Sequence, residues 1–460
     1  MSKFPEERQQ EQGFRMNRRK FLKAGASTAL AMGLIGALNV APASAAEAVV
    51  GASVIHNGAQ SKLRPDNTGR YGGSSVKIAP YNDQWLGTTK IVGQVQNYNE
   101  IDHGFIIAMR GELGLTAKNA VFKDGQPYHF ITKYPVGYAE MILVKGPLAP
   151  ENVVDGIPSA KKMPIPDPEQ MSQNIKDLAY FLRADDVGIG KMPPYAYYSH
   201  KLVNRDALLK GDLAAAVIPV TERMPYVITF VIDQNLETML ASTGYDSISG
   251  SQSFLGYHAT AVIAIIIANY IRRLGYHARA NHSGNYNAVM PPTLIASGLG
   301  ELSRTGDCTV HPRLGIRHKC GAVTTDLPLA PDNPIDFGLH DFCRVCKKCA
   351  DNCPAGAITH DADPVEYNGY LRWNSDMRKC TVFRSTNDQG SSCGRCMKVC
   401  PWSSKEETWF HTAGTWIGSH GQASSKFLKS IDDMFGYGTE QIDKYKWWLE
   451  WPEMLKNNTP

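Results

Sequence analysis

The middle of the chain alternates between helical and strand-like spacing of apolar residues. Residues 171–192 predict an amphipathic helix followed by a short strand, "VGIG". The apolar run "YVITFVI", Tyr226–Ile232, predicts a buried strand, and a long helix is expected from about Gly256 to Leu274. Another helix is expected in "TLIASGLGELSRTG", ending near Gly306. This alternation of strands and helices predicts an α/β (α+β) core.

The first 45 residues have the pattern of a targeting segment. The pair Arg18–Arg19 precedes an uncharged, moderately apolar run at 24–40, and Ala43–Ala45 offers an A-x-A cleavage site. We interpret 1–45 as a twin-arginine signal peptide, with an N-terminal membrane anchor as the alternative. The protein is therefore expected in the periplasm or on the outer face of the cytoplasmic membrane. The apolar run at 259–278 is interrupted by Asn269, Arg272 and Arg273, so we expect a buried core helix and not a membrane span.

Four parts follow the signal segment. We expect an N-terminal region at 46–170, an α/β core at 171–334, a cysteine-rich insert at 335–405 and a C-terminal tail at 406–460. The tail holds five of the eight tryptophans and should pack back onto the core; they are Trp409, Trp416, Trp447, Trp448 and Trp451.

The charge balance argues against one class of partner. The chain has 48 Lys and Arg against 44 Asp and Glu, a net charge of +4. Residues 1–45 contribute seven basic and three acidic residues, which leaves 41 of each sign in the remainder. A chain without excess positive charge lacks the basic face that nucleic acids require.

Eight of the ten cysteines have ferredoxin spacing. The first set follows C-x2-C-x2-C-x3-C-P, and the second has a twelve-residue first gap and then the same x2 and x3 spacings; the sets are Cys343, Cys346, Cys349, Cys353 and Cys380, Cys393, Cys396, Cys400. In the bacterial ferredoxin run three cysteines bind one [4Fe-4S] cluster and the fourth binds the other cluster. Zinc ligation and disulfides are the weaker alternatives.

This spacing predicts which cysteines share a cluster. Cluster one would take Cys343, Cys346, Cys349 and Cys400, and cluster two would take Cys353, Cys380, Cys393 and Cys396. Two adjacent clusters carry single electrons, so redox work is expected. Cys308 and Cys320 fit neither set and are expected to be buried thiols.

Several segments together resemble respiratory reductive dehalogenases of the corrinoid, iron–sulfur type, especially the tetrachloroethene enzymes. The likeness covers the signal and about residues 175–440, in segments such as "DDVGIG", "YIRRLGYHA", "SGLGELSRTG", "CGRCMKVCPW" and "DDMFGYG". The resemblance implies a nitroreductase-like core that binds a base-off corrinoid, a cobamide, with a ferredoxin-like double-cluster insert. The chain agrees in lacking D-x-H-x-x-G, the motif that supplies a cobalt-ligating histidine in other corrinoid enzymes.

The resemblance also implies catalytic residues. Tyr257 matches the tyrosine that supplies a proton, at the start of the long helix. A phenol releases its proton at neutral pH only if a cation stabilises the phenolate. In "GIRHK", Lys319 is the expected cation where the family usually has arginine, with Arg317 as the substitute.

Other residues are expected to hold substrate or cofactor. Asn285, or Asn281 in the same loop, matches an asparagine that would hydrogen-bond the substrate. The aromatic segment "PPYAYYSH" is expected to line the pocket through Tyr195, Tyr197 and Tyr198.

The implied reaction replaces carbon–halogen by carbon–hydrogen in an organohalide, with chlorinated ethenes such as tetrachloroethene as the best guess. Two clusters would pass electrons singly to the corrinoid and generate Co(I). The family implies a small hydrophobic membrane-anchor protein and a reduced donor of a respiratory chain as partners, besides the twin-arginine export machinery. The alternatives are an exported ferredoxin-type electron carrier without corrinoid and an enzyme like epoxyqueuosine reductase.

Overall fold

The computed structural model describes residues 76–121, 135–390, 392–403, 425–426, 429–430 and 438–449. All of them belong to one unit, Ala52–Pro460. The predicted signal peptide at 1–45 lies outside the described residues, as do Trp409, Trp416 and Trp451.

A four-stranded sheet carries the core. Its strands, in spatial order, are β5 (Asp186–Lys191), β8 (Tyr226–Asp233), β12 (His318–Thr325) and β9 (Ala278–Asn281). Every neighbouring pair is antiparallel, and β8 and β12 pair along their whole length. The predicted strands at "VGIG" and "YVITFVI" are therefore present, and the core is α+β, since no pair of strands in this sheet is parallel.

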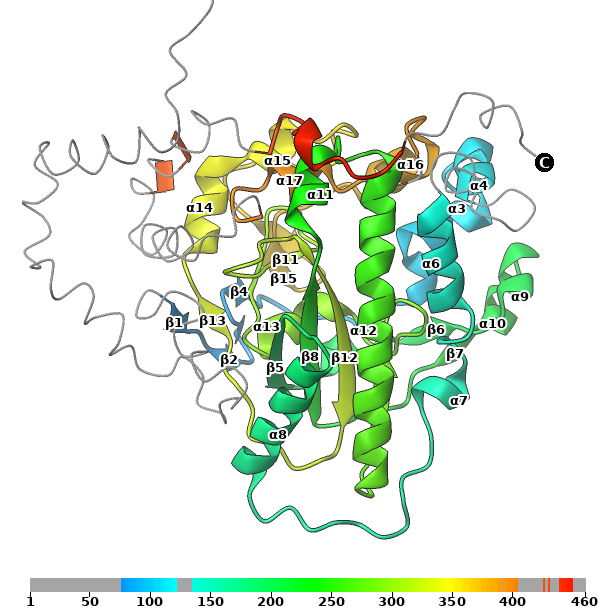
Figure 1. The fold of residues 1–460 in the computed structure, drawn as a ribbon, viewed down its shortest axis with the longest axis vertical. Coiled ribbons are helices and arrows are strands. Elements are labelled where there is room, and N and C mark those ends of the chain that lie inside the picture. The colour runs from blue at the N-terminus through cyan, green and yellow to red at the C-terminus, as the bar shows by residue number, and fades with distance from the viewer. Residues whose placement is uncertain are drawn as a thin grey trace, which may run out of the picture. The chain divides into compact units, whose positions relative to one another are not determined.

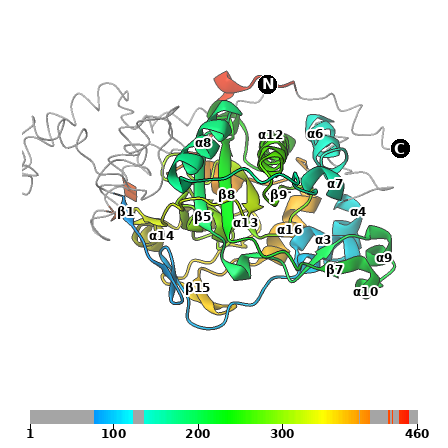
Figure 2. The same cartoon turned by 90° about the horizontal axis from the view of Figure 1, so that it is seen from below.

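Two helices cover one face of this sheet. They are α8 (Pro168–Phe181) and α12 (Ser247–Arg273), as Figures 1 and 2 show. Alternate strand residues point to this face, as the period of two requires. The apolar cluster between sheet and helices includes Val187, Ile189, Ile228, Phe230 and Val323 from the strands and Ile175, Ile263, Ile267 and Ile271 from the helices. Its members are almost fully buried, so this cluster is the main core.

The opposite face packs against α13 (Met290–Ala296). Backbone meets backbone there, because a Cβ on Gly190 would lie 2.7 Å from the carbonyl carbon of Ala296. The helix predicted to end near Gly306 ends ten residues earlier. The chain turns at Gly298, which has φ +69°, and then forms the hairpin of β10 (Glu301–Leu302) and β11 (Thr309–Val310). A glycine in the left-handed conformation commonly ends a helix. The prediction was wrong here because it extended the helix beyond Gly298.

Helix α12 begins nine residues before the predicted start at Gly256. Asp246 caps it by accepting a hydrogen bond from the Ser249 N–H, and the low-propensity stretch that follows is almost wholly buried. Tertiary packing overrides weak helix propensity here. Tyr257 therefore lies well inside the helix.

Helix α12 is also long and apolar enough by composition to cross a membrane, but the core helix of a soluble protein meets the same criterion. Its most apolar stretch is 44% buried inside the fold. It packs against α6 (Pro135–Lys145) as well as the sheet, in agreement with the expected core helix.

The N-terminal part and the segment 194–219 add short elements. They are β1 (Lys77–Ile78), β2 (Tyr81–Asn82), β3 (Trp85–Leu86), β4 (Thr89–Lys90), η4 (Glu100–Asp102), α3 (Gly104–Arg110), α4 (Leu115–Val121), α7 (Glu151–Val154), η5 (Pro194–Ala196), β6 (His200–Leu202), α9 (Arg205–Leu209), α10 (Leu213–Ala216) and β7 (Val217–Pro219). Strand β1 pairs with β13 (Ile335–Asp336), just before the cysteine-rich part.

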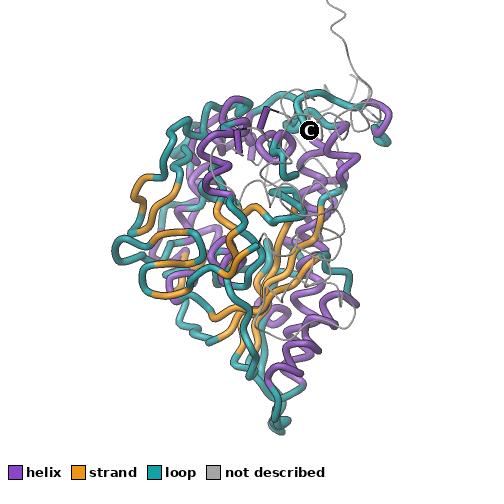
Figure 3. Tube along the Cα trace, turned by 90° about the vertical axis from the view of Figure 1, so that its left-hand side faces the viewer, coloured by secondary structure: helices purple, strands orange, loops and turns teal. Residues whose placement is uncertain are grey.

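The cysteine-rich part is built from short helices and one hairpin. They are α14 (Leu339–Cys346), α15 (Lys348–Asp351), β14 (Val365–Tyr367), β15 (Tyr370–Arg372), α16 (Met377–Thr386) and α17 (Arg395–Val399). Figure 3 shows these helices at one end of the strands.

Helix α11 (Leu236–Ala241) joins this part to the core and to the tail. The buried Lys398 ammonium donates to the carbonyls of Leu240 and Ser242, at 2.8 and 2.6 Å, at the C-terminal end of α11. A cation is favourable at a helix C-terminus. The tail segment with η6 (Asp443–Tyr445) contacts the same helix, and the Trp447 indole donates to Thr238 at 2.7 Å.

A buried ion pair ties α8 to the loop before β13, and its removal should destabilise the core. Lys176 and Asp332 approach to 2.6 Å, and Asp332 also accepts from the Ile189 N–H at 2.9 Å. We expect Asp332→Ala to lower the free energy of unfolding by about 3–5 kcal/mol, because it leaves a buried charge without its carboxylate.

Chemical denaturation of identically metal-loaded samples measures this loss. Asp363→Ala is the matched control. It removes a carboxylate whose side chain is 73% exposed and which is paired with Arg344. An exposed pair contributes about 0–1 kcal/mol. Equal losses in the two variants would contradict the assignment of Asp332 as a core anchor.

Candidate functional site

Four cysteines surround one cavity beneath α14. Cys343 and Cys346 come from α14, Cys349 from α15, and Cys400 follows α17. The cavity is lined by Ser303, Arg304, Thr305, Val310, Ile316, Phe342, Cys343, Cys346, Lys347, Cys349, Cys400, Pro401 and Trp402. Lys347 adopts φ +55° between the two helices, and this tight turn brings successive cysteines to the same side.

The cysteines are buried enough to disfavour free thiolates. Burial, reinforced by the neighbouring thiols, raises the pKa of Cys349 and raises the pKa of Cys343 to about 12. Such thiols ionise when a metal binds them. Among the described residues no three His, Cys, Asp or Glu side chains converge as ligands of a single ion. Four thiols around a cavity instead suit a cubane, whose four irons each take one ligand.

The remaining four cysteines form a second group. The Cys393 thiol interacts electrostatically with Cys380 and Cys353, and the Cys396 thiol with the spare Cys308 as well as with Cys393 and Cys380. Cys353 thus lies with the second motif, whereas Cys400 lies with the first. These are the two groups of four expected from the ferredoxin spacing.

Tyr257 and Lys319 lie together beside α12. The Lys319 ammonium lies 5.4 Å from the centroid of the Tyr257 ring, within the range of a cation–π interaction. Gly256 permits this approach, because a Cβ there would lie 2.8 Å from the Lys319 Cβ. No hydrogen bond joins the two side chains in this structure, and catalytic hydrogen bonds often form only with substrate present.

A second cation near Tyr257 was not predicted from the sequence. Arg384 follows Cys380 by four residues in α16, so both side chains lie on one face of the helix. Arg384 hydrogen-bonds to Cys380, and the Cys380 thiol and the Tyr257 hydroxyl raise its pKa against the opposing effect of burial. The i, i+4 spacing from a cluster cysteine was the available signal, but Arg384 in isolation looks like a surface charge.

Cys308, Cys320 and Tyr286 also lie near Lys319 or Tyr257. Burial raises the pKa of Cys308, and it raises the pKa of Cys320 to about 12, while Lys319 acts on both in the opposite direction. Tyr286 interacts electrostatically with Tyr257, Cys320 and Tyr198. Cys308 and Cys320 were predicted to be buried thiols, and in the structure both are partly buried.

Arg317 is placed differently from Lys319. Its side chain is 1% exposed, lies 3.1 Å from the Asp233 carboxylate and donates to the Gln234 carbonyl at 3.3 Å. Arg317 lies just before β12, so the alternation of side chains along a strand does not decide where it points. Its ion pair with Asp233 holds it at the end of β8. Lys319 is thus the cation beside the Tyr257 ring, whereas Arg317 forms an ion pair with Asp233.

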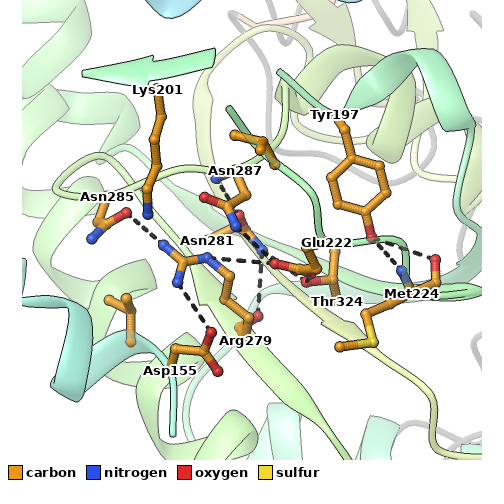
Figure 4. Close-up of polar contacts among 12 residues, drawn as sticks. Asp155, Tyr197, Lys201, Glu222, Met224, Arg279, Asn281, Asn285, Asn287 and Thr324 are labelled. Atoms are coloured by element: carbon orange, nitrogen blue, oxygen red, sulfur yellow. Dashed lines mark hydrogen bonds and ion pairs between the residues drawn. The ribbon is translucent and has the colours of Figure 1, made fainter. Parts of the chain in front are cut away.

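Asn285 and Asn281 belong to a polar network around Arg279, shown in Figure 4. Arg279 is buried and lies 2.5 Å from Glu151, and it donates to Asn285 at 2.6 Å. Asn285 in turn donates to the Ala149 carbonyl and to Glu151, at 2.9 and 3.0 Å. Burial would raise the pKa of Glu151, but Lys201, Arg279 and Asn285 lower it to about 2.

The amide groups of both asparagines are therefore engaged. Asn281 is fully buried, donates to Thr324 at 3.2 Å and accepts from the Asn287 N–H at 2.7 Å. The side-chain hydrogen bonds of these two described asparagines go to residues other than Tyr257. Of this loop, Tyr286 is the residue that interacts with Tyr257.

One of the three predicted pocket tyrosines lies in a different cluster from the other two. Tyr195 packs in the cluster of Leu86 and Ile295, away from the other two. The Tyr197 hydroxyl accepts from the Met224 N–H at 2.8 Å, as Figure 4 shows. Tyr197 and Tyr198 belong to one buried cluster against which Tyr286 packs, and Tyr198 also interacts electrostatically with Tyr286. The aromatic segment thus contributes two of its three tyrosines to the surroundings of Tyr286.

Comparison with known proteins first concerns the cysteine-rich part. A family model for a 4Fe-4S dicluster domain matches residues 342–404. The match contains all eight cysteines of the two groups, so this part of the chain is a dicluster domain with two [4Fe-4S] clusters.

Curated relatives extend the similarity beyond this domain. The chain is 39% identical over 221 residues to a tetrachloroethene reductive dehalogenase of Desulfitobacterium hafniense, a match covering 46% of this chain and 38% of that protein. It is 28% identical over 301 residues to the tetrachloroethene reductive dehalogenase of Sulfurospirillum multivorans, covering 60% of this chain and 58% of that one. The matches thus span less than two thirds of these relatives.

Solved structures agree with the sequence similarity. A catabolic reductive dehalogenase in complex with 3-bromo-4-hydroxybenzoic acid has a TM-score of 0.70 at 33% identity, covering 82% of this chain and 51% of that one. A reductive dehalogenase structure described with B12-dependent dehalogenation has a TM-score of 0.70 at 34% identity and the same coverage. In sequence and fold the chain is thus related to reductive dehalogenases, and the predicted fold class is confirmed.

Proposed function

We propose that this chain is a reductive dehalogenase, an oxidoreductase that replaces a carbon–halogen bond of an organohalide by carbon–hydrogen. The observation that carries the proposal is the Lys319 ammonium 5.4 Å from the Tyr257 ring centroid, in a chain that also holds a dicluster domain. Such a reaction consumes two electrons and one proton. The dicluster domain supplies the electrons one at a time, and the Tyr257 hydroxyl is a proton donor beside a cation.

The protein side chains divide the proton chemistry between them. Tyr257 delivers the proton that replaces the halogen, which leaves a phenolate. Lys319 stabilises this phenolate, because a positive charge in a poorly solvated site favours the ionised form. The Arg384 guanidinium interacts electrostatically with both the Cys380 thiol and the Tyr257 hydroxyl. It adds a second positive charge where both the phenolate and an electron-bearing cluster need one.

The residues around Tyr257 fit a large cofactor such as a corrinoid. Tyr286 and Cys320 have pKa values raised strongly by burial, yet both keep partial solvent access, as side chains around an internal space do. Nearby in the chain, the buried Asn287 Oδ1 and His282 Nε2 have no hydrogen-bond partner. We propose that Tyr198, Tyr286 and Asn287 hold the corrinoid. When bound, the corrinoid supplies reduced cobalt that breaks the carbon–halogen bond.

Substrate, location and partners belong to the same proposal. Two relatives are tetrachloroethene reductive dehalogenases by name, which supports chlorinated ethenes as the substrate class. The pair Arg18–Arg19 in the signal pattern supports export by the twin-arginine route to the outer face of the cytoplasmic membrane. There the chain would act as the terminal reductase of organohalide respiration, with a small membrane-anchor protein and a reduced respiratory donor as partners.

The first test is the metal content of anaerobically purified, cofactor-loaded protein. About one cobalt and about eight irons per chain are expected, since each [4Fe-4S] cluster holds four irons. Loss of chloride from tetrachloroethene with a low-potential electron donor should accompany them. Eight irons without cobalt, from a host that supplies corrinoid, would favour an electron carrier and contradict the proposal.

Removing the Lys319 charge should slow the reaction. We expect Lys319→Gln to lower kcat by about 10²-fold, because the phenolate loses its stabilising cation. Lys319→Arg should keep most of the rate, since it restores the charge. Lys191→Gln, at an exposed position of β5, is the control and should leave kcat unchanged. Equal rates for Lys319→Gln and the wild type would remove Lys319 from the mechanism.

A further inference from the structure

Arg304 is a buried cation with no carboxylate partner in the part of the chain that the structure describes. It lies in the turn between β10 and β11, and its side chain is 1% exposed. Its guanidinium donates to carbonyl oxygens of Cys343 at 2.6 and 2.9 Å, of Thr359 at 3.0 Å and of Asp361 at 2.6 Å. These bonds solvate the guanidinium but do not neutralise it.

An uncompensated buried charge is costly, so a negative group is expected nearby. The candidates are the thiolates of the first cluster. Arg304 lines the same cavity as Cys343 and Cys349, and its guanidinium is anchored on the Cys343 carbonyl. The Arg304 backbone N–H also hydrogen-bonds to Cys343. The guanidinium charge and the backbone hydrogen bond of Arg304 thus both act at Cys343.

Trp373 fixes the guanidinium in place. Its ring centroid lies 4.9 Å from the Arg304 guanidinium carbon, and the indole is 1% exposed. Lys347 also lines the cavity but keeps partial solvent access, so water screens its charge. Arg304 is thus a dry, rigid cation, the kind that acts strongly on a neighbouring redox group.

We propose that Arg304 is the counter-charge of the first [4Fe-4S] cluster and raises its reduction potential. One electron enters the cluster from a low-potential donor, no bond breaks, no proton moves, and the cluster gains one negative charge. A fixed cation stabilises this reduced form more than the oxidised form, and net charge and hydrogen bonding are known determinants of cluster potential. Arg304 is a positioning residue in this sense and takes no part in proton transfer.

The proposal requires the dicluster domain but not dehalogenase activity. Its test therefore uses the full chain with both clusters, in a potentiometric titration followed by electron paramagnetic resonance, without substrate. Failure of the proposed function would appear as absent cobalt or absent chloride release, whereas the titration reports on the clusters alone.

We expect Arg304→Gln to shift the reduced-to-oxidised ratio of one cluster at least tenfold toward the oxidised form. For a one-electron couple this is about 59 mV. The other cluster should titrate as in the wild type. Arg344→Gln is the matched control: it removes the same charge next to Cys343 in α14, but Arg344 is partly exposed and paired with Asp341 and Asp363. Its cluster should shift by less than threefold.

Arg304→Lys provides the second variant. It keeps the charge, so both clusters should be present and titrate within threefold of the wild type. If Arg304→Gln loses a cluster, retention of both clusters and of the wild-type titration in Arg304→Lys still supports the counter-charge role. A wild-type titration of Arg304→Gln, equal shifts in Arg304→Gln and Arg344→Gln, a full shift in Arg304→Lys, or loss of a cluster in both Arg304 variants would overturn it.

Discussion

Replacing Tyr257 by Phe should lower kcat by about 10²–10⁴-fold, the usual contribution of a general acid. The variant loses only the hydroxyl, so the ring stays under the Lys319 ammonium and the packing of α12 should persist. Iron and cobalt contents should therefore match the wild type. The measurement is anaerobic chloride release from tetrachloroethene, together with metal analysis of the same sample.

Tyr270 offers a matched control on the same helix. Its hydroxyl donates to the Asn174 side chain at 2.9 Å in an exposed position. Tyr270→Phe should keep kcat within about twofold, as surface substitutions usually have small effects. Wild-type turnover of Tyr257→Phe, with metals retained, would contradict the proton-donor assignment. A loss of activity equal in both variants would point to helix packing instead.

Replacing Cys353 by Ser should damage the second cluster, although Cys353 belongs to the first motif. Its thiol lies with Cys380 and Cys393, whereas Cys400 of the second motif lies with the first group. We expect iron to fall from about eight toward about four atoms per chain, or the damaged cluster to become a three-iron species. Electron transfer through the domain, and with it turnover, should be lost.

Electron paramagnetic resonance spectra of paired variants test whether the last cysteine of each motif binds the cluster of the other motif. Cys353→Ser should give the same remaining cluster signal as Cys380→Ser, and Cys400→Ser the same as Cys343→Ser. Cys308→Ser is the control, because this thiol belongs to neither group, and both clusters should remain. If Cys353→Ser instead matched Cys349→Ser, each motif would hold its own cluster and the crossing would be wrong.

Local sequence signals located several elements of the fold correctly. The apolar strand at Tyr226–Ile232 and the strand at "VGIG" were predicted because continuous burial leaves a run of apolar or small residues. Strand direction was not predictable, because pairing is set by partners far away in the chain. β8 and β12 meet antiparallel although about 85 residues separate them.

Helix boundaries show the opposite balance. The serine- and glycine-rich stretch before Tyr257 has weak helix propensity, so the sequence placed the start of α12 too late. Burial of that stretch and the Asp246 cap make it helical. Helix α13 was predicted too long for a different reason, since Gly298, a left-handed glycine directly after the helix, was not taken as its end.

For the site, the sequence by itself determined the ligand chemistry. Cysteine spacing groups thiols within a few helical turns, and such local geometry survives in any fold that contains the motif. The likeness around "GIRHK" also named Lys319 and Arg317 together. Only the tertiary structure decided between them, because Arg317 is held by Asp233 at the end of β8 whereas Lys319 reaches α12 beside Gly256.

The cations near the clusters depended wholly on the tertiary structure. Nothing in the sequence marks Arg304 as buried, and for Arg384 the only signal is its i, i+4 spacing from Cys380. The fold brings distant groups to both: Arg304 hydrogen-bonds to Cys343, 39 residues further along the chain, and Arg384 interacts electrostatically with Tyr257 of α12. The sequence thus determined the cysteine pattern of the two groups and indicated Tyr257 as the candidate proton donor. The fold decided which charges surround them, because electrostatic strength depends on burial and distance in three dimensions.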